Sequence, residues 1–464
     1  MRDYVYAGSR LISAVEKPTS IDPNSQCGII FPGVPPVIVT AASNQDPCFT
    51  FKGTAGRSVS AIITAASPTT FSASWYANFR KPDGTLLGTT GSTCCGYSRI
   101  FLDGREIPAD GNYKLTIDPS GAASGTVSVA LYEFTDITGS ISLTGDPITL
   151  PLLTPGQNAR LTFAGVAGQL LSSSLTALAP AAFVGSFYFQ IRKPDGGLVA
   201  SGSSCCGYSL GFLDTVPLPA LPASGTYTLL VNPDDIATGT VAARLYNVTH
   251  LTGTITSDGT PATVQVTTPG QNGYLTFEGI AGQRITATMT AVSPTAFPST
   301  WGYVHIQNPS NTTIASSIAC CGSTTVFVDT IELPAAGTYR AMVDPSSTWT
   351  GTVTVRVTTI TDVTGSVTIG GGAAPVTITT AGQRALITFS GTAGQQATVR
   401  VTNGKTGYTT VTLKKPDGST ATSYSTSGSN FNLATQTLVD GQYTIIVDPS
   451  GTGTGTLNVA VTAP

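Results

Sequence analysis

This 464-residue chain has few charged side chains and almost no histidine. Lys, Arg, Asp and Glu together make up 10% of the residues, and there are two histidines. Typical soluble domains carry about 25% charged residues. The formal net charge of −3 leaves no basic field for nucleic acid. No uncharged apolar run approaches the roughly 20 residues that span a bilayer. We therefore expect neither a nucleic-acid partner nor membrane insertion.

Catalytic and cofactor signatures are missing as well. The chain contains no Ser-His-Asp arrangement, nucleotide-binding loop or paired-carboxylate motif. The stretch Asn232–Gly239 lacks the alternate-oxygen spacing of a calcium loop, and two histidines offer little for a zinc site. We expect a protein that is not an enzyme and that holds no metal or cofactor.

The composition is nevertheless that of a folded, exported protein. Apolar residues reach 41%, which argues against disorder. Many hydroxyl side chains, few charges and paired cysteines are typical of extracellular proteins. The N-terminus has no signal-peptide apolar region. We expect an extracellular or cell-surface location in a bacterium, reached by another export route or from a longer precursor.

Four copies of one unit make up most of the chain. The string FKGTAGR at Phe51–Arg57 returns as FAGVAGQ, FEGIAGQ and FSGTAGQ. Other markers keep the same phase: a KPDG or NPSN turn, a G-x-Y before an apolar run, and a closing DP or NP. The second glycines of the first motif are Gly56, Gly168, Gly282 and Gly394. A spacing near 112 residues indicates tandem domains.

Strand and turn signals fill each unit. Apolar residues alternate with a period of two, and Pro-Asp-Gly predicts a hairpin turn. Seven to nine short strands in about 110 residues predict an all-β fold of four tandem immunoglobulin-like β-sandwich domains in a linear array. The predicted segments are an extended N-terminal arm (1–20) and β-sandwich repeats 1 (21–140), 2 (141–254), 3 (255–366) and 4 (367–464), the last shortened and without cysteines.

These repeated markers resemble a known module. The pattern of TPGQN, AGQ, KPDG, GTYT, VDPS and DVTGSVTI is similar to the pre-peptidase C-terminal-like β-sandwiches of large secreted bacterial proteins. The opening YVYAGSRLISAVE resembles the closing strand of YD (RHS) repeats. These resemblances imply a non-catalytic accessory or structural module on the cell surface, and they bring no catalytic residues to this chain.

Adjacent cysteines stand in the first three repeats, as Cys94-Cys95, Cys205-Cys206 and Cys320-Cys321. A metal site would need more ligands, and a reactive thiol would need nearby positive charge. Repeats 2 and 3 hold no other cysteine, so the neighbour is the only partner within the domain. We favour a vicinal disulfide that forms a rigid structural loop. Pairing with another chain and free thiols remain alternatives.

Cys27 and Cys48 differ from the adjacent pairs. They are separated by 21 residues and have no counterparts in later repeats. We predict a conventional disulfide that fastens the N-terminal arm to the first domain. Closing a loop of this length stabilises a fold by roughly 3 kcal/mol.

Aromatic residues recur before each predicted hairpin turn, including Trp75, Tyr76, Tyr188, Trp301 and Tyr303. Their recurrence fits core packing better than a sugar-binding platform. Exposed members could still bind surface glycans.

The two ends of the chain suggest a way for copies to join. The links between repeats each supply a strand, and none follows repeat 4. If that strand belongs to the preceding repeat, repeat 4 has an open groove; if it belongs to the following one, Gly28–Gly33 serves repeat 1 and nothing is missing. The candidate donor-strand residues of the arm are Tyr4, Val5, Tyr6, Leu11, Ile12 and Val15.

An unpaired sheet edge can accept a strand from another chain. The leading hypothesis is therefore a structural subunit of a pilus-like extracellular fibre, in which copies form a head-to-tail homopolymer by N-terminal donor-strand exchange. The alternatives are a non-catalytic stalk or spacer, and a glycan-binding adhesin module of a larger YD-repeat-type surface protein.

Overall fold

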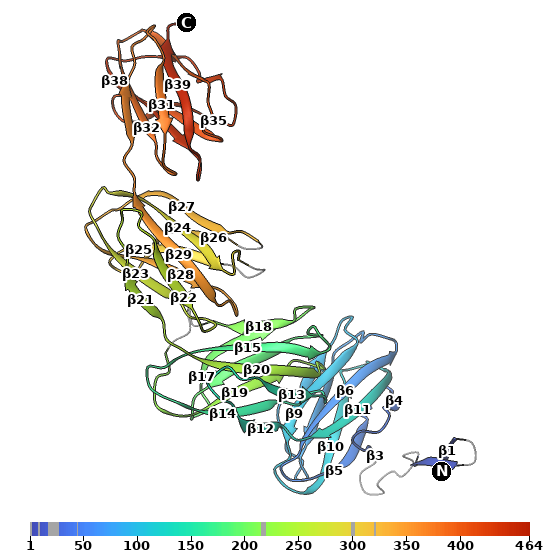
Figure 1. The fold of residues 1–464 in the computed structure, drawn as a ribbon. Coiled ribbons are helices and arrows are strands. Elements are labelled where there is room, and N and C mark those ends of the chain that lie inside the picture. Colours follow the sequence, from blue (N-terminus) through green and yellow to red (C-terminus); the bar gives the residue numbers. More distant parts are fainter. Residues whose placement is uncertain are drawn as a thin grey trace. The chain divides into compact units, whose positions relative to one another are not determined.

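The computed structural model describes residues 2–7, 10–16, 27–43, 45–214, 220–297, 302–319 and 322–464, and all regular structure among them is β-strand. Strands β1 to β39 follow the chain in order (Figure 1). The chain divides into two compact units, Met1–Asn247 and Val248–Pro464.

The first unit begins with a hairpin, followed by two repeats. The hairpin consists of β1 (Arg2–Ala7) and β2 (Arg10–Glu16). Repeat 1 consists of β3 (Gly28–Ile29), β4 (Val37–Ala41), β5 (Cys48–Gly53), β6 (Ser58–Ser67), β7 (Trp75–Arg80), β8 (Gly91–Thr93), β9 (Arg99–Glu106), β10 (Gly111–Pro119) and β11 (Gly125–Phe134). Repeat 2 consists of β12 (Ile137–Ser140), β13 (Ile148–Leu152), β14 (Ala159–Gly165), β15 (Leu170–Ala179), β16 (Phe187–Arg192), β17 (Leu198–Ser204), β18 (Leu210–Leu213), β19 (Gly225–Pro233) and β20 (Gly239–Val248).

The second unit holds two further repeats. Repeat 3 consists of β21 (Leu251–Thr254), β22 (Ala262–Val266), β23 (Gly273–Gly279), β24 (Arg284–Ser293), β25 (Gly302–Gln307), β26 (Thr313–Ala319), β27 (Thr325–Glu332), β28 (Gly337–Pro345) and β29 (Gly351–Thr359). Repeat 4 consists of β30 (Val363–Ser366), β31 (Ala374–Ile378), β32 (Ala385–Gly391), β33 (Gln396–Thr402), β34 (Thr409–Lys414), β35 (Thr420–Thr426), β36 (Phe431–Asn432), β37 (Gln436–Thr437), β38 (Gly441–Pro449) and β39 (Gly455–Thr462).

The strand order corrects the predicted fold, because the repeats do not have the immunoglobulin-like topology. In repeat 2 one sheet has the order β12-β14-β19-β16-β17, and the other has β13-β20-β15-β18. The other repeats keep this order, with one extra short strand, β37, in repeat 4. When the nine strands are lettered A to I, the sheets read A-C-H-E-F and B-I-D-G, which is a double-sheet jelly roll with one added strand. Immunoglobulin sheets group the strands as A-B-E-D and C-F-G.

The reason for this error lies in the connections. In repeat 2 every pair of consecutive strands lies in opposite sheets, except the hairpin of β16 and β17. A period of two shows which face of a strand is buried, but it does not show which sheet the strand joins. Both topologies therefore produce the same hydrophobic pattern.

The first strand of each repeat pairs parallel with the third. β12 pairs with β14, β21 with β23 and β30 with β32, and β3 makes the equivalent pairing with β5. The linking strand therefore belongs to the repeat that follows it. Consequently Gly28–Ile29 serves repeat 1, and repeat 4 has every strand found in repeats 2 and 3.

Each repeat encloses its own hydrophobic core between its two sheets. The four clusters of buried side chains extend over Ile30–Leu131, Ile141–Leu245, Ile255–Val357 and Val367–Val461. Each core contains the phenylalanine of the F-x-G motif stacked on the tyrosine of G-x-Y, with ring centroids between 5.2 and 5.9 Å apart. The repeated motifs are therefore packing motifs.

The glycine in F-x-G leaves room for that tyrosine. A Cβ at Gly165 would lie 2.7 Å from a ring carbon of Tyr227. The Tyr227 hydroxyl donates a hydrogen bond to the carbonyl oxygen of Ala223 at 2.7 Å. The buried ring thus has a satisfied polar end, and both motifs follow from one packing arrangement.

Candidate functional site

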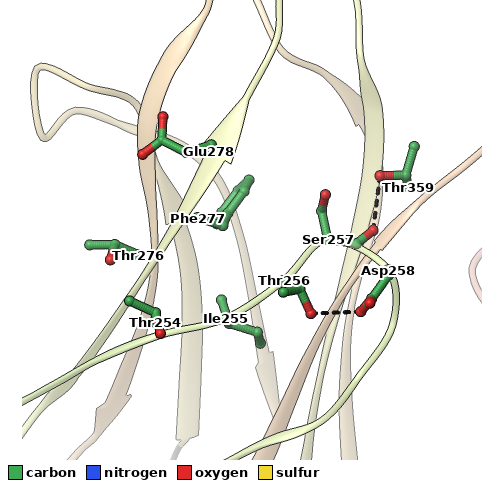
Figure 2. Close-up of a pocket in the computed structure, with 9 residues that line it drawn as sticks. All are labelled: Thr254, Ile255, Thr256, Ser257, Asp258, Thr276, Phe277, Glu278 and Thr359. Carbon is green, nitrogen blue, oxygen red and sulfur yellow. Dashed lines mark hydrogen bonds between the residues drawn. The ribbon is translucent and has the colours of Figure 1, made fainter.

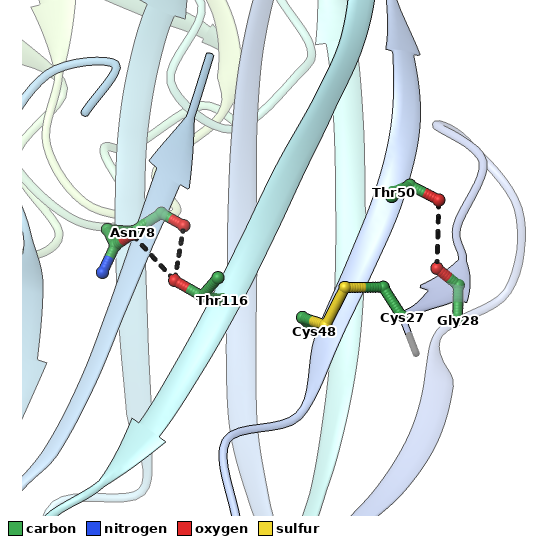
Figure 3. Close-up of a disulfide and its surroundings, with 6 residues drawn as sticks. All are labelled: Cys27, Gly28, Cys48, Thr50, Asn78 and Thr116. Carbon is green, nitrogen blue, oxygen red and sulfur yellow. Dashed lines mark hydrogen bonds between the residues drawn. A yellow bond between two sulfur atoms is a disulfide. The ribbon is translucent and has the colours of Figure 1, made fainter. Parts of the chain in front are cut away.

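The disulfide between Cys27 and Cys48 joins the segment before β3 to the start of β5 (Figure 3). Its Cα atoms lie 4.8 Å apart, and the Cys27 side chain is buried. Beside it, the Thr50 hydroxyl donates to the Gly28 carbonyl at 3.3 Å. The bond holds the short parallel strand β3 against its sheet.

The double-cysteine loops of repeats 1 and 2 have the same backbone shape. Cys95 and Cys206 have positive φ values of 54° and 58°. In each loop a tyrosine lies three positions after the first cysteine, and its backbone nitrogen donates a hydrogen bond to the carbonyl oxygen of that cysteine. The bonds are Tyr97 to Cys94 and Tyr208 to Cys205, both at 3.1 Å. The loops are therefore turns that the backbone itself stabilises.

The chemical states of these cysteines differ. Cys205 and Cys206 form a vicinal disulfide, whereas Cys94 and Cys95 are thiols. A hydrogen bond with Cys95 raises the pKa of the Cys94 thiol, which favours the protonated form and gives it little nucleophilic character. Cys320 and Cys321 lie outside the described residues.

The predicted donor strand has a different structure from the single extended arm expected. Tyr4, Val5 and Tyr6 lie in β1, and Leu11, Ile12 and Val15 lie in β2. The two strands pair with each other in antiparallel register, for example Tyr4 with Ala14. Together they form a two-stranded sheet.

Two features of repeat 4 offer no support for the predicted donor-strand exchange. Repeat 4 already contains its first strand, β30, which pairs along Val363–Ser366 with β32. Its last strand, β39, lies inside the second sheet between β31 and β33. No strand position of repeat 4 is vacant, so its topology gives the predicted pilus-like fibre no support.

Within the first unit, a turn of repeat 2 is seated on repeat 1. The Ser60 hydroxyl donates to the Pro155 carbonyl at 2.6 Å. A Cβ at Gly156 would lie 3.0 Å from the Gly104 nitrogen, so the two backbones are in close contact. Arg99 of repeat 1 also donates through Nε to the Asp235 carboxylate of repeat 2 at 3.0 Å.

Within the second unit, repeats 3 and 4 meet through the equivalent residues. Thr330 donates its hydroxyl hydrogen bond to the Gly382 carbonyl, and Gly382 contacts Thr286 as Gly156 contacts Ser60. The Asp362 carboxylate of the link pairs with Arg284 on one side and with Arg384 on the other. The junction is thus made by direct contacts of both backbones and side chains.

The described residues contain no cluster of three His, Cys, Asp or Glu side chains able to hold a metal ion. His305 lies on β25, stacked on Tyr303 with ring centroids 5.6 Å apart. Its Nε2 is 3.8 Å from the Asp344 carboxylate. None of the described residues belongs to a helix of membrane-spanning length and hydropathy.

A pocket of about 590 Å³ lies in repeat 3, between the segment after β21 and strand β23 (Figure 2). Its walls include Thr254, Asp258, Phe277 and Glu278. Asp258 accepts hydrogen bonds from Thr256 and Thr260, which lower its pKa to about 2. Glu278 is engaged by the Thr338 hydroxyl. The Asp258 carboxylate thus stabilises its own turn, whereas Glu278 is held across the pair of strands β23 and β28.

The exposed tyrosines Tyr97 and Tyr208 are a surface feature that the sequence analysis did not predict. Among the recurring aromatics, Trp75 is buried while its neighbour Tyr76 faces solvent. Tyr97 and Tyr208, which follow the double cysteines, are among the most exposed large side chains of the described chain. The sequence contained one indication that an aromatic side chain is exposed. Trp75 and Tyr76 are neighbours on β7, and successive side chains of a strand point to opposite faces, so only one of the two can face the core.

Comparisons with known proteins show only distant similarity. No family model and no curated protein sequence matches the chain. The pre-peptidase C-terminal domain of a Bacillus anthracis collagenase is 16% identical over 22% of this chain and 96% of that domain, with a TM-score of 0.20. The tetra-tandem repeat from the extending region of a large adhesion protein is 13% identical, covering 84% of this chain and 91% of that one, with a TM-score of 0.12. The BSP domain of a biofilm associated protein is 10% identical, covering 92% and 95% respectively, with a TM-score of 0.14.

Proposed function

We propose that this chain is a non-catalytic spacer of an extracellular bacterial protein. The turn that packs against the preceding repeat, at the 1–2 junction in the first unit and at the 3–4 junction in the second, carries this proposal. Gly156 is packed against repeat 1, and Gly382 is packed in the same way against repeat 3. A spacer needs such contacts because only a restrained link transmits position from one domain to the next.

Short links support the same proposal. Two residues separate β11 from β12, and three separate β29 from β30. Links of this length cannot act as the flexible coils that longer Gly/Ser-rich segments form. Disulfides at Cys27–Cys48 and Cys205–Cys206 support an oxidising, extracellular location.

Truncation of the N-terminal segment tests the spacer against the fibre. A spacer is monomeric in light scattering, and deletion of Met1–Ser20 leaves its mass per particle unchanged apart from the deleted residues. Electron microscopy of the secreted protein provides the second measurement. Fibres that disappear on deletion of this segment would refute the spacer proposal and support the fibre hypothesis.

A further inference from the structure

Repeat 1 has a pocket of about 430 Å³ beside its double-cysteine loop. Tyr76 on β7 and Tyr97 in the loop line it, with 38% and 70% of their surface exposed. Within the described residues neither phenol makes a hydrogen bond to the protein. Ligand pockets range from about 300 to 1,000 Å³, so this pocket is large enough for a small molecule or the end of a polymer.

The Tyr97 ring projects from a rigid backbone. Its carbonyl accepts a hydrogen bond from the Phe71 nitrogen at 2.8 Å, and Gly96 donates to the Phe71 carbonyl at 2.9 Å. Phe71 is buried, with its ring 5.2 Å from that of Trp75. Because the loop is anchored to the core, a ligand that stacks on Tyr97 orders little additional chain.

Repeat 2 has the same pair of exposed tyrosines and the same loop anchor. Tyr188 and Tyr208 are 37% and 69% exposed, close to the values in repeat 1. The loop is anchored on Phe183 by the same two hydrogen bonds, of 2.8 and 3.0 Å. Here the loop also carries the Cys205–Cys206 disulfide. The exposed pair of tyrosines therefore recurs at equivalent positions in repeats 1 and 2, unlike aromatic residues scattered singly over a surface.

Repeat 3 has the loop but only half of the aromatic pair. Phe297 makes the equivalent backbone hydrogen bond to Ser323, so serine occupies the place of Tyr97. Tyr303, at the place of Tyr76, is stacked on His305. Gly322 and Ser323 therefore make both backbone hydrogen bonds to Phe297 without a tyrosine, so the ring in repeats 1 and 2 is not needed for this anchor.

Charge in the repeat 1 pocket is already neutralised. Arg99 lines the pocket, but its guanidinium is paired with Asp235. The remaining polar groups include the hydroxyls of Ser74 and Ser92, which are neutral donors and acceptors. The site thus offers aromatic faces and neutral hydrogen-bonding groups. That combination suits a sugar ring, which has an apolar C–H face and a rim of hydroxyls.

We propose that repeats 1 and 2 each bind a neutral saccharide, with Tyr76 and Tyr97 forming one site and Tyr188 and Tyr208 the other. This activity is additional to the spacer role and independent of it. The two sites lie in one chain, so a polysaccharide that reaches both would bind more tightly than a short oligosaccharide.

Affinity electrophoresis of the full chain tests the proposal. The probes are two neutral polymers, mixed-linkage β-glucan and galactomannan, and one anionic polymer, alginate; a neutral glycan array extends the search. The double variant Y97S/Y208S copies the serine of repeat 3. The matched control Y408S/Y424S removes two exposed tyrosines from repeat 4. Circular dichroism checks that both variants are folded.

We expect a neutral glycan to retard the parent chain and the control equally. Y97S/Y208S should bind it about tenfold more weakly or worse, equivalent to about 1.4 kcal/mol. Three results would overturn the proposal: no neutral glycan binding on gels or array, unchanged binding by Y97S/Y208S, or stronger retardation by alginate. Tyrosine-dependent binding of a proline-rich peptide in place of glycans would assign the site to a protein partner instead.

Discussion

At the scale of single residues, the stacked pairs of phenylalanine and tyrosine explain why certain glycines recur. Gly391 of repeat 4 faces the Tyr443 ring, where an added Cβ would lie 2.8 Å from a ring carbon. Tyr443 is buried and its hydroxyl accepts a hydrogen bond from the Val439 nitrogen at 2.8 Å. The ring therefore cannot move without losing packing or this bond.

The variant Gly391→Ala should destabilise repeat 4 by about 1–3 kcal/mol, because overpacking forces shifts in a dense core. Denaturant unfolding followed by tyrosine fluorescence measures the change. Gly372→Ala is the control, since a Cβ there meets no atom within 4 Å. Equal unfolding midpoints for the two variants would contradict this account of the motif.

A second residue-scale prediction concerns His250. The equivalent position of the other two links is aspartate, Asp136 or Asp362, and Asp136 accepts a hydrogen bond from the Asn158 nitrogen at 3.0 Å. His250 accepts the equivalent bond through Nδ1 from the Asn272 nitrogen at 3.1 Å. An imidazole that accepts at Nδ1 must be neutral at that atom. Burial lowers the pKa of His250, and the Asp344 carboxylate partly opposes this.

Because the folded-state pKa lies below the ordinary value of about 6.5, His250 contributes full stability above that pH. The contribution is lost as the pH falls through 6.5 and the folded-state pKa. Thermal melting between pH 7.5 and 5 should therefore show an acid-sensitive loss that His250→Asp removes. Identical pH profiles for the parent chain and this variant would show that the bond does not matter.

At the scale of structural elements, the junction turns connect the repeats. Gly156 has a φ of 85°, a conformation that favours glycine, and it also touches Gly104 of the preceding repeat. Gly168 has a φ of 80° but no atom within 4 Å of an added Cβ. These two glycines separate the cost of backbone conformation from the cost of lost contact.

The variant Gly156→Ala should loosen the junction of repeats 1 and 2, whereas Gly168→Ala should strain only its own turn. Amide hydrogen exchange of residues 153–157 and 103–105 measures the difference. We expect faster exchange in both segments for Gly156→Ala, and unchanged exchange there for Gly168→Ala. If both variants left these segments equally protected, the turn would not be the element that joins the repeats.

At the scale of the whole molecule, the two disulfides of the described residues differ in the length of chain that they close. The Cys27–Cys48 bond closes a loop of 21 residues, and loss of such a loop costs roughly 3 kcal/mol. Calorimetry should show that C27S/C48S lowers the melting temperature of repeat 1. C205S/C206S should change stability much less, since adjacent residues close almost no loop. Similar losses for both variants would contradict the loop-closure explanation.

Local patterns of the sequence predicted local structure well. Each KPDG segment forms a tight turn, with Gly84, Gly196 and Gly418 in the left-handed region. Asn311 adopts the same conformation at the NPSN segment of repeat 3, as asparagine tolerates it better than most residues. These features depend on a few neighbouring residues, so they can be read without knowing the fold.

The candidate site was only partly predictable. The double cysteines marked the loop, but the pocket also needs Tyr76, which lies 18 residues before Cys94. Trp75 and Tyr76 are equally aromatic in the sequence. Only the packing of Trp75 against Phe71 separates the core residue from the exposed one.

The four repeats, their all-β character and their turns could be predicted from the amino-acid sequence. Glycine and proline impose local backbone conformations, and a hydrophobic period of two is visible within a few residues. The tertiary structure alone decided that the strands form jelly rolls and that each linking strand joins the repeat after it. The assignment of a linking strand to a repeat depends on pairings such as Val363 with Ala385, which are 22 residues apart in the sequence. Such pairings follow from how whole sheets bury their apolar faces together, and no short segment of the chain contains that information.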